Sequence, residues 1–197
     1  MIAAEYPDSG LKPWRFSVSD YRIMAKHNFW TPDERVELID GILIDLPTPS
    51  AAHAQVSVRL NTALQRGAGK PWQVRVGKAL QLSARSEMLP DLVLLKRRNY
   101  GRAIPAAADA LVVIEIADDT TLETDREIKL PLYAAANIPE TWIAYLQRQS
   151  IVRYHDPRQD GYATAHDFQR GETITSLTLP VINLPVDAVF GPALAAP

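Results

Sequence analysis

Apolar positions recur along the first third of the chain with periods that change from helix-like to strand-like and back. The expected elements cover residues 17–27, 35–39, 42–46 and 50–66. Asp40-Gly41 separates the two middle segments, and this dipeptide between apolar runs is a strong β-hairpin signal. Val56, Leu60 and Leu64 follow helical spacing and indicate one buried helix face. The pattern therefore predicts a short helix, a hairpin and a longer helix.

The rest of the chain alternates between strand-like runs and one further helical segment. Strands are expected at about 72–82, 89–95, 110–117, 141–147 and 150–155, followed by a β-rich tail to Phe190. A helix is expected from about Thr121 or Thr124 to Asn137, and Thr124-Asp125-Arg126-Glu127 fits a capping box. Pro131 lies inside this helix and should kink it beside Lys129.

These elements predict a fold of the α/β (α+β) class, with a mixed β-sheet flanked by helices. We see no internal repeat, linker or low-complexity segment. The expectation is a single domain over residues 1–197, with a core at about 17–190 and a frayed tail at 191–197.

Composition narrows the function classes. The 197 residues contain no cysteine, which excludes disulfides, thiolate zinc sites and cysteine nucleophiles. The start of the chain lacks the pattern of a secretory signal, and no apolar run reaches the roughly 18 residues needed to cross a membrane. We expect a cytoplasmic protein without a membrane partner.

The net charge of −2 hides an uneven distribution. Between Arg59 and Arg102 there are ten Lys and Arg residues against two acids, Glu87 and Asp91, so this segment carries +8 and the remainder −10. A face that attracts phosphate is one interpretation, and solvated strand and helix edges are the other.

Two carboxylates stand in runs that are otherwise apolar. Asp91 lies in LPDLVLL and Glu115 in LVVIEIA. A charge in a buried strand costs several kcal/mol, so each carboxylate needs a cation or a raised pKa. If the two strands pair, both side chains can converge, and Mg²⁺ or Mn²⁺ would suit such oxygen ligands. The alternative for each is an ion pair with arginine or a position in solvent.

Other acidic and basic residues have two interpretations each. Lys129 follows Asp125 by four residues, so it either forms an exposed helix pair or faces the metal site, where it would stabilise charge on phosphate. Glu37 is either solvated at an edge or a third acid of the site. His53 is either a capping or packing residue or a ligand. The chain has neither a phosphate-binding loop nor a serine-hydrolase elbow.

The ordered series of motifs resembles the Uma family of restriction endonucleases, within the PD-(D/E)xK nuclease superfamily. The matching stretches are VELIDGILIDLPTPSAAHAQ, LPDLVLL, LVVIEIADDTT, DREIKLPLYAAANIPETWIAY and GETITSLTLPVINLPVDAVF. The resemblance implies a restriction-endonuclease-like core and a Mg²⁺- or Mn²⁺-dependent endonuclease that hydrolyses DNA. It assigns metal binding to Asp91 and Glu115, and catalysis to these two together with Lys129 and Glu37.

The resemblance also names supporting residues and a departure. His53 and Asp125 match family positions, and Tyr133 is a third supporting candidate because it lies one helical turn after Lys129. The superfamily's usual lysine would fall at position 117, which is alanine, and the resemblance implies that Lys129 replaces it.

The basic residues after the Asp91 strand are candidates for holding the DNA backbone, namely Lys96, Arg97, Arg98 and Arg102. A homodimer would supply the two active sites that cutting of both strands often needs. One alternative is an inactive nuclease fold that binds nucleic acid or serves in assembly. Another is a metal-dependent hydrolase of a small substrate, for which a closed pocket is expected.

Overall fold

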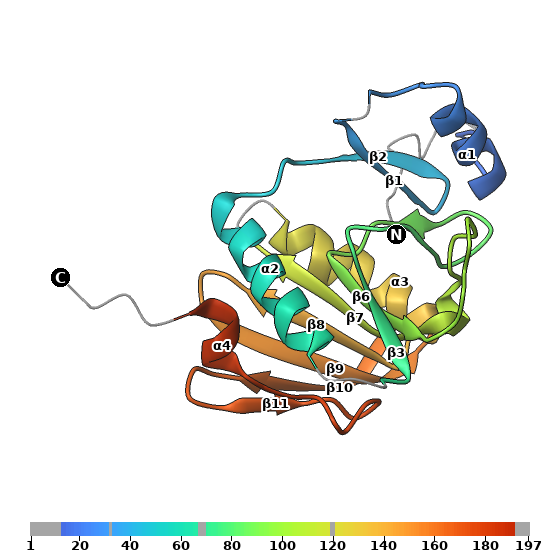
Figure 1. The fold of residues 1–197 in the computed structure, drawn as a ribbon. Helices are drawn as coiled ribbons and strands as arrows, with labels where there is room; N and C mark the ends of the chain where they lie inside the picture. The colour runs from blue at the N-terminus through green and yellow to red at the C-terminus, as the bar shows by residue number, and fades with distance from the viewer. Residues whose placement is uncertain (1–12, 32, 67–69, 119–120, 192–197) are drawn as a thin grey trace.

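A computed structural model describes residues 13–31, 33–66, 70–118 and 121–191. A six-stranded mixed sheet in the order β10-β9-β8-β7-β6-β3 forms its centre (Figure 1). The strands are β3 (Trp72–Val76), β6 (Leu92–Lys96), β7 (Ala110–Ala117), β8 (Glu140–Tyr145), β9 (Ser150–Arg158) and β10 (Gly161–Phe168). Strands β7 and β8 run parallel, and the other neighbouring pairs are antiparallel.

Helices cover both faces of this sheet, which confirms the predicted architecture (Figure 1). Helix α2 (Ala51–Gln65) packs its Val56, Leu60 and Leu64 against one face of β7, where Ile114 and Ile116 point. Helix α3 (Leu130–Ala135) packs on the other face, with Leu130 and Tyr133 buried. Because β7 has helices on both sides, nearly all of its side chains are buried.

A second sheet of four strands carries the N-terminal hairpin, in the order β2-β1-β5-β4. Its strands are β1 (Arg35–Ile39), β2 (Ile42–Leu46), β4 (Leu80–Gln81) and β5 (Glu87–Met88), with α1 (Val18–Lys26) packed beside them. The hairpin prediction is confirmed, since Asp40 and Gly41 both have positive φ, as a type I′ turn requires. A side chain at Gly41 would also collide with Arg15.

The remaining elements are short. They are η1 (Ala107–Asp109), η2 (Thr124–Lys129), β11 (Thr173–Thr175), β12 (Asn183–Pro185) and α4 (Val186–Phe190). The chain end predicted as β-rich therefore finishes in a short helix, whose Val186 and Val189 join the core beside α2. Most of the predicted frayed tail, residues 192–197, lies outside the described residues.

Two predicted elements differ from the structure. The single strand expected at 72–82 is two strands, β3 and β4, in different sheets. Gly77 separates them with a φ of +55° and donates its amide to the Asp91 carbonyl at 2.9 Å, so the chain turns there. The capping box at Thr124 is wrong, because the preceding Glu123 is already helical and makes no side-chain cap.

The length and apolar character of the helices bear on whether one of them could cross a membrane. Within the described ranges, no helix combines the length and apolar character that a bilayer crossing requires.

Candidate active site

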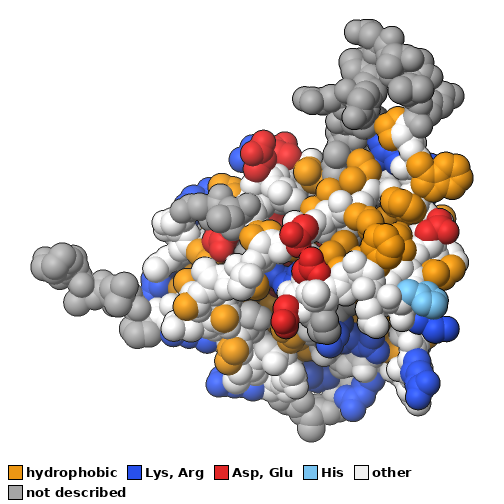
Figure 2. Space-filling view, turned by 90° about the horizontal axis from the view of Figure 1, so that it is seen from above, with side chains coloured by type: hydrophobic (Ala, Val, Ile, Leu, Met, Phe, Trp, Pro, Cys, Tyr) orange, Lys and Arg blue, Asp and Glu red, His pale blue; other side chains and the backbone are white. Residues whose placement is uncertain are grey.

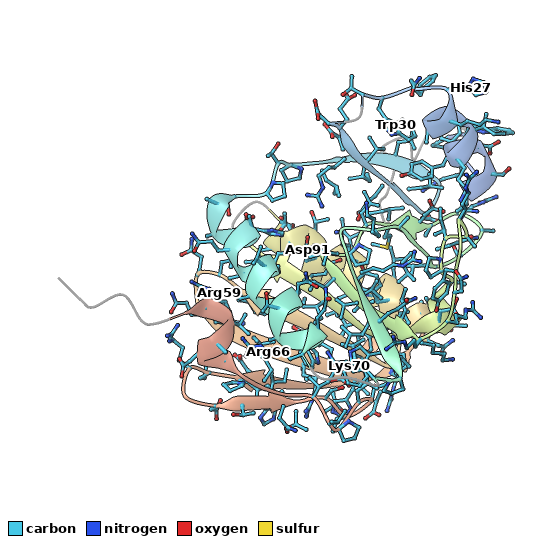
Figure 3. The ribbon with its side chains drawn as sticks, in the orientation of Figure 1. His27, Trp30, Arg59, Arg66, Lys70 and Asp91 are labelled. Carbon is cyan, nitrogen blue, oxygen red and sulfur yellow. The ribbon has the colours of Figure 1, made fainter. Side chains whose placement is uncertain are left out.

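Antiparallel pairing of β6 with β7 places the two strand-borne carboxylates together. Leu92 is opposite Ile114, so Asp91, which immediately precedes β6, stands opposite Glu115. The Asp91 amide donates to Glu115 Oε2 at 3.2 Å. Figure 3 shows Asp91 at the end of the sheet near the start of α2. The strand pairing on which the predicted convergence depends is confirmed, although Asp91 lies just before the strand and not inside it.

The Asp91 carboxylate is held by two groups from different elements. Its Oδ2 accepts a hydrogen bond from the Ile116 amide at 2.8 Å and lies 3.0 Å from His53 Nε2. Helix α2 orients His53, because the N-cap Ser50 Oγ accepts a hydrogen bond from the His53 amide. His53 is buried and packs against the predicted metal ligand, so it sits where a supporting residue would.

Glu115 lies deeper, on the α3 face of the sheet. Its Oε1 accepts a hydrogen bond from the Tyr133 hydroxyl at 2.5 Å and lies 3.5 Å from Lys129 Nζ. Burial raises the pKa of Glu115 well above its usual value, although the nearby Lys129 ammonium acts in the opposite direction. Burial likewise raises the pKa of Tyr133, which therefore remains a hydrogen-bond donor to the carboxylate.

Lys129 is the centre of the cluster. Its Nζ lies 3.3 Å from Glu37 Oε1, 3.5 Å from Glu115 Oε1 and 3.5 Å from Asp125 Oδ1. These carboxylates come from β1, β7 and η2. Burial favours the neutral amine, but the surrounding carboxylates outweigh it and raise the pKa of Lys129. The ammonium is 6% exposed, so the alternative of an exposed helix pair is wrong.

A π-helical turn brings Asp125 and Lys129 to the site. Over Thr124–Lys129 the helix is wider than an α-helix, and the Leu130 amide donates to the Asp125 carbonyl, five residues back. Pro131 follows in α3, which continues this turn without a break, and it has no N–H to donate to a carbonyl of the preceding turn. The irregularity expected at Pro131 is therefore a change of helix type that starts before the proline.

Glu37 is completely buried, so the alternative of an edge position in solvent is wrong. Its Oε1 accepts a hydrogen bond from the Leu89 amide at 2.7 Å. Its Oε2 is buried without a hydrogen-bond partner among the described residues. An unsatisfied carboxylate oxygen of this kind is costly and indicates that the cluster has capacity for a proton or a further cation.

A narrow cleft of about 30 Å³ opens onto the cluster. Asp91, His53, Asp125 and Lys129 line it, whereas Glu115 and Glu37 lie behind them. Figure 2 shows acidic side chains near the middle of this face and basic side chains toward its edges. This volume holds about one water molecule, so a phosphodiester can only approach the cleft from its mouth.

Arg35 and Thr121 also line the cleft and were not predicted from the sequence. No spacing or apolar context marks either residue, since Arg35 begins the hairpin and Thr121 stands in a polar stretch. The Ile116 amide, which donates a hydrogen bond to Asp91, is a backbone group, so the pattern of side chains along the sequence could not predict it.

The structure does not bring the basic candidates to this site. Lys96 ends β6 at the opposite end from Asp91, five residues or roughly 16 Å along the strand. Its Nζ donates to the Ala108 carbonyl, and Arg98 forms an ion pair with Asp109 at 2.6 Å. Arg97 and Arg102 belong to the same end of the strand and the turn that follows.

Asp125 gives a direct test of the cluster's electrostatics. Burial raises its pKa from 3.8 to about 6, although Lys129 acts against this shift. Because the folded state holds this proton more tightly than the unfolded state, the contribution of Asp125 to stability falls as pH rises between about 4 and 6. We expect Asp125→Asn to raise the free energy of unfolding at pH 8 by about 2–3 kcal/mol and to change it little below pH 4.

Urea unfolding at several pH values measures this difference. Asp160→Asn, at the exposed turn between β9 and β10, is the matched control and should change stability by less than about 0.5 kcal/mol. A loss of stability in Asp125→Asn at pH 8 would contradict the expected cost of the charged carboxylate.

Comparisons with known proteins give the family and the fold of this chain. The model of the family described as "Uma2: Putative restriction endonuclease" matches residues 18–187. A crystal structure from Anabaena variabilis, described as "a putative nuclease belonging to DUF820", has a TM-score of 0.62 at 14% sequence identity. The match covers 79% of this chain and 89% of that protein, and it confirms the fold. No curated protein matches the sequence.

Proposed function

Because this chain belongs to the Uma2 family, whose model is described as "Putative restriction endonuclease", we propose that it is a nuclease that hydrolyses DNA phosphodiester bonds with a divalent metal ion. The site would use Asp91 and Glu115 with Mg²⁺ or Mn²⁺, and Lys129 as the positive group beside the metal. Glu37 would complete this catalytic set.

One observation carries the proposal. A buried ammonium, Lys129, lies within 3.5 Å of carboxylates from three separate elements, and Asp91 lines the same cleft as Lys129. Folding stability alone rarely favours such a group, since replacing buried ions with apolar residues is often neutral or stabilising. Buried titratable groups with shifted pKa values beside a cleft are typical of functional sites.

The donor set fits a divalent cation. Glu37, Asp91, Glu115 and Asp125 supply carboxylate oxygens, and three of them share the one ammonium of Lys129, so positive charge is in deficit within this cluster. The unpartnered Glu37 Oε2 points to the same deficit of positive charge. In the described part of the chain, no three acidic or histidine side chains converge closely enough to hold an ion by themselves. Mg²⁺ commonly uses one or two carboxylates with water and substrate phosphate.

When bound, the ion would polarise the phosphoryl group and lower the pKa of an attacking water. The chain's own residues then have separate tasks. Lys129 stays protonated and stabilises negative charge that develops on the phosphate. The Ile116 amide and His53 keep Asp91 in one orientation, and Tyr133 does the same for Glu115.

DNA contacts away from the cleft would come from the basic segment. Lys96, Arg97, Arg98 and Arg102 lie about 16 Å along β6 from Asp91, so they would contact phosphates remote from the scissile bond. Contacts of this kind position a duplex without reading its sequence and weaken steeply with salt.

Calorimetric titration with Mn²⁺ and Mg²⁺, on the parent protein and on Asp91→Ala, tests the metal site directly. We expect binding to the parent and at least a tenfold loss of affinity in the variant, because one of two carboxylate ligands is gone. A nuclease assay can fail because its substrate is wrong, whereas metal binding cannot fail for that reason.

Absence of metal binding, both alone and with added DNA, would contradict the proposal. Asp91 and Glu115 would then be structural residues. The alternative of an inactive nuclease fold that binds nucleic acid would take precedence, and salt-dependent DNA binding without cleavage would support it.

A further inference from the structure

A second cavity lies beside the candidate active site on the α3 face of the sheet. Its volume is about 310 Å³, within the lower range of ligand pockets. Six of the residues that line it define what we call the tyrosine pocket: Ala117, Arg126, Tyr145, Arg148, Val152 and Tyr154. Asp118 lines both the tyrosine pocket and the cleft of Asp91, so the two cavities are neighbours.

The position of Ala117 explains why there is a pocket here. Ala117 follows Glu115 by two residues on β7, so both side chains point to the same face, roughly 7 Å apart. A longer side chain at this position would project over Tyr145, to which Ala117 is paired across the parallel strands. Alanine leaves the space beside the second acid of the site open.

The walls of the tyrosine pocket are aromatic. The hydroxyls of Tyr145 and Tyr154 lie 3.2 Å apart, and both side chains pack in one cluster with Val152 and Ala117. Burial raises the pKa of Tyr154, as expected for a phenol in apolar surroundings. A planar heterocycle can stack against such walls, and stacking on tyrosine is a common way to hold bases of single strands.

Two arginines lie at the mouth. The Arg148 guanidinium is 4.1 Å from the centre of the Tyr145 ring, and Arg126 projects from η2. Arg148 pairs with Asp167 at 3.7 Å and Arg126 with Glu127 at 3.0 Å, with more than half of each arginine side chain exposed. Exposed pairs of this kind contribute little, so both guanidinium groups can turn to a phosphate instead.

We propose that the tyrosine pocket holds one unpaired nucleobase of the DNA strand whose neighbouring phosphate lies at the cleft of Asp91. This inference rests on the proposed nuclease function and adds a substrate class, namely DNA with an unstacked nucleotide beside the scissile bond. A base that remains stacked in a duplex cannot stack on the tyrosine walls of this pocket, whereas an extruded base can. Among the described residues, no Tyr, Trp or Phe side chain lines the cleft of Asp91, so the stacking surface for the adjacent base is in the tyrosine pocket.

Fluorescence anisotropy with two labelled oligonucleotides tests the pocket: a fully paired duplex, and the same duplex with one extra unpaired nucleotide. Titrations in EDTA make binding independent of metal. The parent protein should bind the bulged duplex about tenfold more tightly, since one stacked base contributes about that factor. Tyr154→Leu and Arg148→Ala should reduce this preference to less than about twofold.

Arg158→Ala is the matched control, because Arg158 is an exposed arginine of β9 outside the pocket and its loss changes the net charge equally. It should keep the preference. If Tyr154→Leu is unfolded by circular dichroism, Arg148→Ala decides, since its side chain lies at the surface. Equal binding of both duplexes by the parent, or a preference that survives both pocket variants, would overturn the proposal.

Cleavage with Mn²⁺ is measured separately on the same oligonucleotides. Preference for the bulged duplex, without cleavage and without Mn²⁺ binding in the calorimetric titration, would support the tyrosine pocket and contradict the nuclease proposal. Cleavage of both duplexes without a binding preference would support the nuclease proposal and overturn the tyrosine pocket.

Discussion

Asp91→Asn is expected to abolish metal-dependent DNA cleavage while leaving the fold intact. Asparagine keeps the shape of the side chain and an oxygen that can accept the Ile116 amide, so the structural hydrogen bond survives. It removes the negative charge that a divalent ion needs. We expect the rate to fall by more than about 10²–10³-fold, the loss typical of removing one strong electrostatic group from an active site.

Cleavage of a labelled oligonucleotide with Mn²⁺ under single-turnover conditions measures this effect. Asp45→Asn provides the control, since Asp45 is an exposed carboxylate on β2 and its loss changes net charge by the same amount. Circular dichroism and unfolding by urea establish that Asp91→Asn is folded. A variant that is folded and cuts at the parent rate would refute the assignment of Asp91 as a metal ligand.

Lys129→Met is expected to cause the largest loss of stability in the molecule at neutral and alkaline pH. Three buried carboxylates, Glu37, Glu115 and Asp125, would lose the cation they share. Breaking a buried ion pair by removing one partner typically costs about 3–5 kcal/mol, because the remaining charge is left uncompensated. Catalysis should be lost as well, but the free energy of unfolding is the more direct measurement.

The pH dependence distinguishes this cause from poor packing. The pKa values of Glu115 and Asp125 are already raised by burial, and loss of Lys129 raises them further. For such groups the neutral form is favoured in the folded state, so stability increases as pH falls. The deficit of Lys129→Met should therefore be largest near pH 8 and shrink toward pH 5.

Urea unfolding at pH 8 and pH 5 measures both quantities. Lys78→Met, at an exposed position, is the matched control and should change the free energy of unfolding by less than about 0.5 kcal/mol. Addition of Mn²⁺ at pH 8 should restore part of the stability of Lys129→Met, because a cation then replaces the ammonium. A deficit that is equal at both pH values would indicate lost packing in place of lost charge.

Local sequence signals predicted the elements with strong periodicity. The hairpin at Asp40-Gly41 and the helix with Val56, Leu60 and Leu64 on its buried face agree with the structure within one or two residues. The strand at 110–117 agrees completely. The pairing that brings Asp91 to Glu115 was also accessible, because two apolar runs, each with one acid, have few other ways to satisfy both charges.

Features that depend on tertiary contacts were not accessible. The chain turns at Gly77 because its two flanking segments join different sheets, which no local pattern reveals. The helix widens before Pro131 so that Asp125 and Lys129 face the same carboxylates. Burial of Lys129 likewise depends on tertiary contacts with β1 and β7. The distance from Lys96 to Asp91 follows from strand direction, so proximity in sequence was misleading.

The contacts of Glu37 limit which segments can be exchanged between related proteins by recombination. It belongs to the small sheet, yet its carboxylate reaches Lys129 at the end of η2 and the Leu89 amide in the segment that joins β5 to β6. His53, on α2, is likewise supplied by chain that precedes Asp91. The segment from Asp91 to Tyr133 is thus not a transplantable module. A crossover between distant relatives inside the connecting region would exchange half of the residues that surround Lys129, so the two parent sequences must be compatible on both sides of the breakpoint.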